Sequence, residues 1–129
     1  MATAEKPKGG LEDVVATTSA ICYLDGERGV LAYRGYDIHD LATEATFEEV
    51  CHLLWHGRLP NRAELGGLQS ELAAARALPE GILRLMRTLP QDNAMDTMRT
   101  LVSALSHYDA QSKDESPEGR YRTSVRLTS

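Results

Sequence analysis

The spacing of apolar and polar positions along this chain predicts a small β-hairpin followed by a series of helices. Two short runs of β-favouring residues, 20–24 and 30–33, flank an Asp-Gly turn at residues 25–29. Such a pair is typical of a hairpin with a loop of about five residues. A hairpin of this size is only marginally stable alone, so we expect it to pack against the helices.

Beyond residue 36 the apolar spacing becomes helical, and residues 37–44 predict a first short helix. Thr46 and Glu49 then form a capping-box pattern, in which a hydroxyl caps the first amides and a carboxylate reaches back. Gly57 suits the left-handed position that ends a helix. Between Thr46 and Gly57, apolar residues recur at helical spacing. They predict an inward face formed by Phe47, Val50, Cys51, Leu54 and Trp55.

The next helix is predicted from Asn61 to about residue 77, with Glu64 completing a second capping box. Its Gly66-Gly67 pair lowers the helix propensity by about 1 kcal/mol per residue and suggests a close contact with another helix. The positions expected to face inward are Leu65, Leu68 and Leu72.

Two further helices are predicted before residue 109. One begins at Pro79, because proline suits the first helical position, and stops before Pro90. The other spans about residues 93–108. The expected inward positions are Ile82, Leu83, Leu85, Met86 and Leu89 in the first, and Met95, Met98, Val102 and Leu105 in the second.

A last helix is predicted after Ser116, with Pro117 and Glu118 in its first turn. No stop signal precedes Ser129, so we expect this helix to be truncated. The predicted fold is therefore mostly α, with a small hairpin near the N-terminus. We expect residues 1–10 to be a flexible lead-in and residues 11–129 to form an incomplete helical domain.

Composition and charge exclude several function classes. A chain of 129 residues is one domain by length, and its net charge of −5 disfavours nucleic acid as a partner. No apolar run approaches the roughly 18 residues of a membrane span, and residues 1–10 lack a secretion signal. Cys22 and Cys51 form no CxxC motif. We expect two reduced thiols in a cytoplasmic protein, with no membrane partner.

Glu48, His52 and His56 are spaced four residues apart and share one helix face, where they could hold a divalent metal. Glu48 and His56 lie two turns apart and no fourth ligand is near in sequence, so a solvated helix face is favoured and no metal is expected. Cys51 and His52 do not form a nucleophile–base pair, because adjacent helix residues point about 100° apart.

The remaining histidines and the arginines of the last helix are also expected to have structural roles or to lie on the surface. His39 and His107 have no matched partner at a useful spacing and are expected on the surface. No phosphate-binding glycine pattern is present. Three arginines of the last helix could bind a carboxylate or phosphate, although basic side chains in this position more often form a solvated face. These are Arg120, Arg122 and Arg126; we assign no catalytic, cofactor-binding or metal-ligating residue.

Several segments resemble, in the same order, the N-terminal part of citrate synthases and the related 2-methylcitrate synthases. Residues 94–100 resemble the Pro-Met-x-x-x-Arg-Thr helix of the family, with Asn93 and Ala94 in place of its usual His-Pro. The resemblance begins at Gly10 and covers nearly the whole chain. The other matching segments are residues 10–15, 19–38, 41–42, 47–50, 53–60, 102–105, 116–118 and 126–128.

The resemblance implies an acyltransferase of the tricarboxylic acid cycle, a homodimer that condenses acetyl-CoA with oxaloacetate to give citrate and CoA. The catalytic aspartate, histidines and arginines of the family belong to later segments, among them His-Gly-Gly-x-Asn and Gly-His-Arg, which this sequence lacks. His56-Gly57 is followed by Arg58 and does not match the catalytic motif. We therefore expect roughly the first third of such an enzyme, inactive alone.

Two interpretations remain open. The chain is either a fragment of a citrate synthase-type enzyme or a small non-catalytic structural or binding subunit that completes its fold with a partner chain carrying the catalytic part. In the second case, exposed apolar faces of the hairpin and the last helix would form the interface. In neither case do we expect a bound cofactor, because acetyl-CoA is a substrate of the family. The preference between acetyl-CoA and propionyl-CoA depends on residues outside this sequence.

Overall fold

The computed structural model describes residues 18–90 and 92–129, so the lead-in expected at residues 1–10 lies outside the described part. Helices dominate that part, which confirms the predicted fold class. The strands are β1 (Cys22–Asp25), β2 (Val30–Tyr33) and β3 (Tyr36–Asp37). The helices are α1 (Ile38–Glu44), α2 (Phe47–His56), α3 (Arg62–Ala75), α4 (Glu80–Thr88), α5 (Ala94–Leu105), the 3₁₀ turn η1 (Ser106–Tyr108) and α6 (Pro117–Thr128).

The predicted hairpin is confirmed, and a local hydrogen-bond pattern fixes its turn. β1 pairs antiparallel with β2, so that Tyr23 lies opposite Ala32. The Asp25 carboxylate accepts hydrogen bonds from the amides of Glu27 and Arg28, at 3.1 and 3.0 Å. An aspartate that bonds to amides two and three residues later holds the chain in a turn, so the Asp-Gly signal correctly located this reversal.

The third strand was not predicted. It forms because Arg34 and Gly35 both adopt positive φ angles, 50° and 90°, and reverse the chain directly after β2. Tyr36 then pairs with Tyr33 to give a three-stranded sheet in the order β1-β2-β3. The Arg34 guanidinium also donates to the Leu54 carbonyl oxygen at 3.1 Å, which joins the sheet to α2.

The helix caps expected from the sequence are present. Thr46 Oγ accepts a hydrogen bond from the amide of Glu49, and the Glu49 carboxylate accepts one from the amide of Thr46. These bonds to Thr46 lower the pKa of Glu49 because they stabilise its ionised form. Gly57 ends α2 with a φ of 78°, as predicted. Asn61 and Glu64 form the second capping box at the start of α3.

Some helix boundaries differ from the prediction. Pro79 is the cap of α4 rather than its first helical residue, because its ψ of 141° is extended and the helix begins at Glu80. α3 ends at Ala75, before the predicted end near residue 77. Ser116 caps α6 by accepting from the amide of Gly119 at 3.0 Å, which confirms the predicted start of the last helix.

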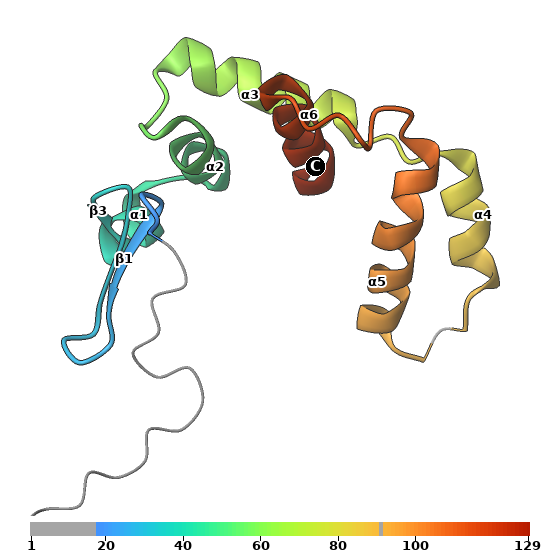
Figure 1. Ribbon diagram of the computed structural model, residues 1–129, viewed down its shortest axis with the longest axis horizontal. Coiled ribbons are helices and arrows are strands. Elements are labelled where there is room, and N and C mark those ends of the chain that lie inside the picture. Colours follow the sequence, from blue (N-terminus) through green and yellow to red (C-terminus); the bar gives the residue numbers. More distant parts are fainter. Residues whose placement is uncertain (1–17, 91) are drawn as a thin grey trace, which may run out of the picture.

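Figure 1 shows three groups of elements along the chain. The sheet and α1 lie together at one end, α2, α3 and α6 form a central group, and α4 and α5 run side by side at the other end. The main core cluster lies in the central group. Its buried members are Cys51, Leu68, Leu72 and Val125, with Trp55, Ala75 and Tyr121 packed against them.

Several predictions about inward faces are wrong. Phe47 is 65% exposed, and the buried side chains of α2 are those of Cys51, His52 and Leu53. Met95, Met98 and Val102 of α5 and Met86 of α4 are also exposed. An apolar stripe shows which side of a helix avoids water, but burial requires a neighbouring element on that side. Among the described residues, no neighbouring element covers these exposed side chains.

The predicted close contact at Gly66 and Gly67 is also wrong for the part of the chain that the structure describes. A Cβ atom added at either glycine would meet nothing within 4 Å. The two glycines therefore lower the helix propensity of α3 without allowing another described helix to approach.

Candidate functional site

Two histidines, a tyrosine and a glutamate gather where α2, α3 and α6 meet; we call His52, His56, Glu71 and Tyr121 the His-Tyr cluster. His52 is only 6% exposed. Its Nδ1 lies 2.9 Å from the carbonyl oxygen of Arg58. Because a carbonyl oxygen only accepts, Nδ1 carries the proton of this bond. Burial and this hydrogen bond give His52 a structural role at the end of α2.

The other members of the His-Tyr cluster connect α2 to α6 and α3. The ring of His56 lies 4.4 Å from that of His52 and 5.6 Å from that of Tyr121, between centroids. The Tyr121 hydroxyl donates to Glu71 at 2.6 Å, and its ring meets Trp55 edge-on at 5.8 Å. Tyr121 is partly buried, and its hydroxyl keeps a hydrogen-bond partner in Glu71. The cluster therefore holds α6 against α2 and α3.

The pKa shifts of His56 and Tyr121 favour the neutral form of both side chains. Partial desolvation lowers the pKa of His56, although its side chain stays exposed; the nearby His52 and Arg58 lower the pKa further, and Glu64 and Glu71 oppose the shift. Burial raises the pKa of Tyr121 to about 12, with a further contribution from its hydrogen bond to Glu71. Tyr121 therefore stays protonated at neutral pH and does not act there as a base.

Acidification is expected to weaken this packing. The pKa of His56 is lower in the folded chain than in the unfolded chain, so the unfolded chain binds more protons as the pH falls through about 6.5. The stabilisation from neutral His56 is thus present above pH 6.5 and lost below it. We expect the thermal midpoint to fall between pH 7.5 and 5.5, and to fall less in His56→Gln.

Fluorescence of Trp55, the single tryptophan, would follow these transitions because its ring contacts Tyr121. His107→Gln is the matched control, since His107 is exposed on η1, away from the His-Tyr cluster. An equal pH effect in His56→Gln and the unmodified chain would contradict this assignment.

The structure brings His52 and His56 together, as their four-residue spacing predicted. The solvated helix face that the sequence favoured is wrong at His52, because this side chain is buried. Among residues 18–90 and 92–129, no three or more His, Cys, Asp or Glu side chains are arranged to hold a metal ion. Cys51 is buried in the core cluster. Burial, followed by the charge of Glu48, raises its pKa, which disfavours the reactive thiolate.

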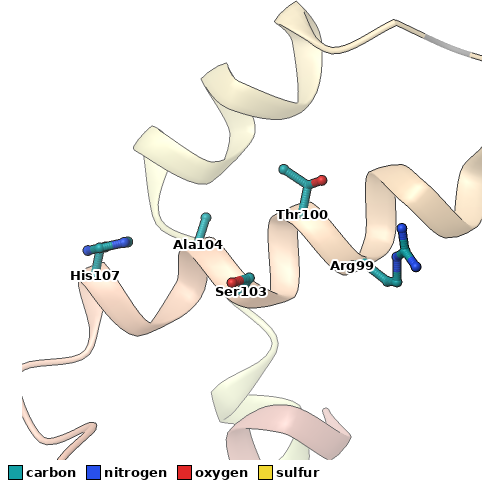
Figure 2. Close-up of a pocket in the computed structure, with 5 residues that line it drawn as sticks. All are labelled: Arg99, Thr100, Ser103, Ala104 and His107. Carbon is teal, nitrogen blue, oxygen red and sulfur yellow. The ribbon is translucent and has the colours of Figure 1, made fainter.

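A hollow of about 460 Å³ follows one face of α5, and Figure 2 shows its lining residues on this helix and the adjoining η1. The Arg99 guanidinium is paired with Asp96 of the same helix at 2.8 Å. His107 is exposed, as is His39 on α1, so both predicted surface positions are confirmed. The lining residues are Arg99, Thr100, Ser103, Ala104 and His107.

Two of the three arginines in α6 bind carboxylates of the chain itself. Arg122 contacts Asp114 at 2.5 Å, and Arg126 pairs with Asp109. The hydrogen bond from Arg126 lowers the pKa of Asp109. Arg120 is exposed. The ion pairs join α6 to the turn that precedes it, so Arg122 and Arg126 already have partners where the sequence suggested ligand binding.

A family model described as the C-terminal domain of citrate synthase matches residues 10–129. The chain belongs to the citrate synthase family. The citrate synthase of Haloferax volcanii is 49% identical over 104 residues, which are 79% of this chain and 27% of that protein. The citrate/2-methylcitrate synthase of Bacillus subtilis is 39% identical over 119 residues, which are 92% of this chain and 32% of that protein.

Solved citrate synthase structures share the fold. The citrate synthase of Pyrobaculum aerophilum superposes with a TM-score of 0.82 and 32% identity, covering 91% of this chain and 32% of that one. The resemblance to citrate synthases noted in the sequence is thus confirmed. This chain spans about a third or less of the length of the relatives that it matches.

The bond between Tyr121 and Glu71 was not found from the sequence. The two residues are 50 positions apart, and no local pattern links them. Tyr121 and Val125 lie one helical turn apart, which places both on the side of α6 that packs against the core cluster.

Proposed function

We propose that this chain is one part of a citrate synthase-type acyltransferase, which converts acetyl-CoA, oxaloacetate and water to citrate and CoA. The observation that supports this most strongly is the family match over residues 10–129 in a chain about a third as long as its relatives. Its part in the enzyme is structural, because the His-Tyr cluster and the ion pairs of α6 hold helices together.

We also propose that this chain has no catalytic activity by itself. The condensation needs a base for the methyl proton, a donor for the enol oxygen and cationic groups for the carboxylates of oxaloacetate. Within the described residues, the buried His52 donates to a carbonyl, and Arg122 and Arg126 are paired with carboxylates. These pairings favour a supporting role, since a working site needs such groups around a shared substrate position.

Release of CoA thiol from acetyl-CoA and oxaloacetate tests this directly. The chain alone is expected to give no release above background. A chimera in which this chain replaces the matching 120 residues of Bacillus subtilis citrate synthase 2, 42% identical to it, is expected to be active. Assaying propionyl-CoA in parallel would measure the donor preference. Turnover by the chain alone would contradict the structural role.

An alternative is a small structural or binding subunit that pairs with a separate catalytic chain. Large apolar side chains exposed on the hairpin and on α6 favour it, because such surfaces often mark interfaces. The downstream DNA separates the two: an in-phase or frameshifted continuation supports a fragment, and an independent reading frame supports two chains. The exposed side chains are those of Ile21, Tyr23, Leu24 and Leu127.

We further propose that the complete enzyme is a cytoplasmic homodimer. Cys22 and Cys51 are free, and unpaired thiols persist in a reducing compartment. The net charge of −5 supports a protein that does not act on nucleic acid. No helix among the described residues has the length and apolar character needed to cross a membrane. Light scattering of the chimera would test the dimer.

A further inference from the structure

A groove of about 570 Å³ lies where three parts of the chain meet; we call it the junction groove. One wall is the link between α3 and α4, the second is α5 with η1, and the third is the end of α6. Four large apolar side chains in these walls are 47–61% exposed. They are Leu78, Val102, Tyr108 and Leu127.

The walls of the junction groove belong to groups that otherwise pack separately. α6 packs on α3, whereas α5 packs on α4, and Figure 1 shows the α4–α5 pair extending beyond the central group. An element inserted in the groove would contact both groups at once. Such an insertion would remove Val102 of α5 and Leu127 of α6 from water, which the hydrophobic effect favours.

The charges in the junction groove disfavour a phosphate-bearing ligand. Asp109 and Arg126 are its charged lining residues, and they pair with each other. Their hydrogen bond raises the pKa of Arg126 and lowers that of Asp109, so both stay ionised and neutralise each other. No unpaired cation therefore remains in the described lining for the phosphates of a nucleotide. An apolar polypeptide segment suits the groove better.

We propose that the junction groove binds an apolar helix from the remaining two-thirds of a citrate synthase polypeptide. The inference rests on the proposed function, because the chain spans only 27–32% of its relatives and most of the enzyme lies outside it. A helix is the expected occupant because the walls are helical and the fold packs helix on helix. This helix would join the α4–α5 pair to the central group.

Thiol labelling at the groove tests the proposal. Leu127→Cys and Val102→Cys place a reporter on each of two walls, in a Cys22→Ser background where Cys51 is buried. Both reporters are expected to react readily in the chain alone. In the Bacillus subtilis chimera they are expected to react at least about tenfold more slowly, because labelling there requires local opening. Arg28→Cys, in the exposed hairpin turn, is the control and is expected to stay reactive.

The outcomes separate the two proposals. An active chimera in which both groove reporters react as fast as in the chain alone would overturn the groove inference and leave the proposed function standing. An inactive chimera with an unfolded circular dichroism spectrum would count against both. Protection in the chain alone that rises with protein concentration would identify a second copy as the occupant. Protection on adding acetyl-CoA to the chain alone would identify a small ligand; either result would overturn the proposal.

Discussion

Replacing Leu53 by alanine is expected to lower the free energy of unfolding by about 2–5 kcal/mol. The Leu53 side chain is 0% exposed, so the substitution removes methyl groups from a fully packed position and leaves a cavity. The buried apolar side chains of the described part are few, and a small domain has a correspondingly small margin of stability. The loss at Leu53 would therefore be a large fraction of the total.

Thermal unfolding followed by circular dichroism would measure this effect, either in the chain or in the Bacillus subtilis chimera. Leu24→Ala is the matched control, because Leu24 is 70% exposed on β1 and its truncation removes little packing. We expect this control to change the free energy of unfolding by about 0.5 kcal/mol or less. Equal effects of the two leucine substitutions would show that Leu53 is not part of a packed core.

Replacing Gly119 by alanine is expected to lower the free energy of unfolding by about 1–3 kcal/mol. A Cβ atom at this position would lie 2.4 Å from the backbone oxygen of Asp114. Backbone cannot move aside as the end of a flexible side chain can, so the turn before α6 would have to shift. That shift would also disturb the cap, in which the Gly119 amide donates to Ser116 at 3.0 Å.

Gly67→Ala is a control with the opposite expected sign. Gly67 lies inside α3, and an added Cβ would meet nothing within 4 Å. Alanine favours a helix over glycine by up to about 1 kcal/mol, so this variant is expected to be more stable than the unmodified chain. Chemical denaturation of both variants would measure the difference. A stability gain in Gly119→Ala would contradict the close approach of Asp114.

The features predicted correctly from the sequence depend on residues that are close along the chain. The Asp25 turn, the Thr46 and Asn61 capping boxes and the left-handed Gly57 each involve hydrogen bonds or φ angles within a few positions. Their energies do not depend on the rest of the fold, so a local pattern is sufficient. The ordered family segments are also a property of the sequence, and the comparisons confirmed the family.

The buried faces were less predictable, because they depend on what packs against each helix. Phe47 lies on an apolar stripe and is exposed, whereas His52, a polar residue further along the same helix, is buried. His52 can be buried because the carbonyl of Arg58 accepts its hydrogen bond. No spacing rule reveals that acceptor, since it becomes available only after the chain turns at Gly57.

The sequence by itself therefore determined the family, the mostly helical fold class, the hairpin and most helix starts. Only the tertiary structure decided which contacts join distant segments, such as Tyr121 with Glu71 and Arg34 with Leu54. It also decided that the walls of the junction groove lie exposed around a shared space. The physical reason is that caps and turns are stabilised within one turn of chain, whereas burial depends on elements brought together from many residues apart.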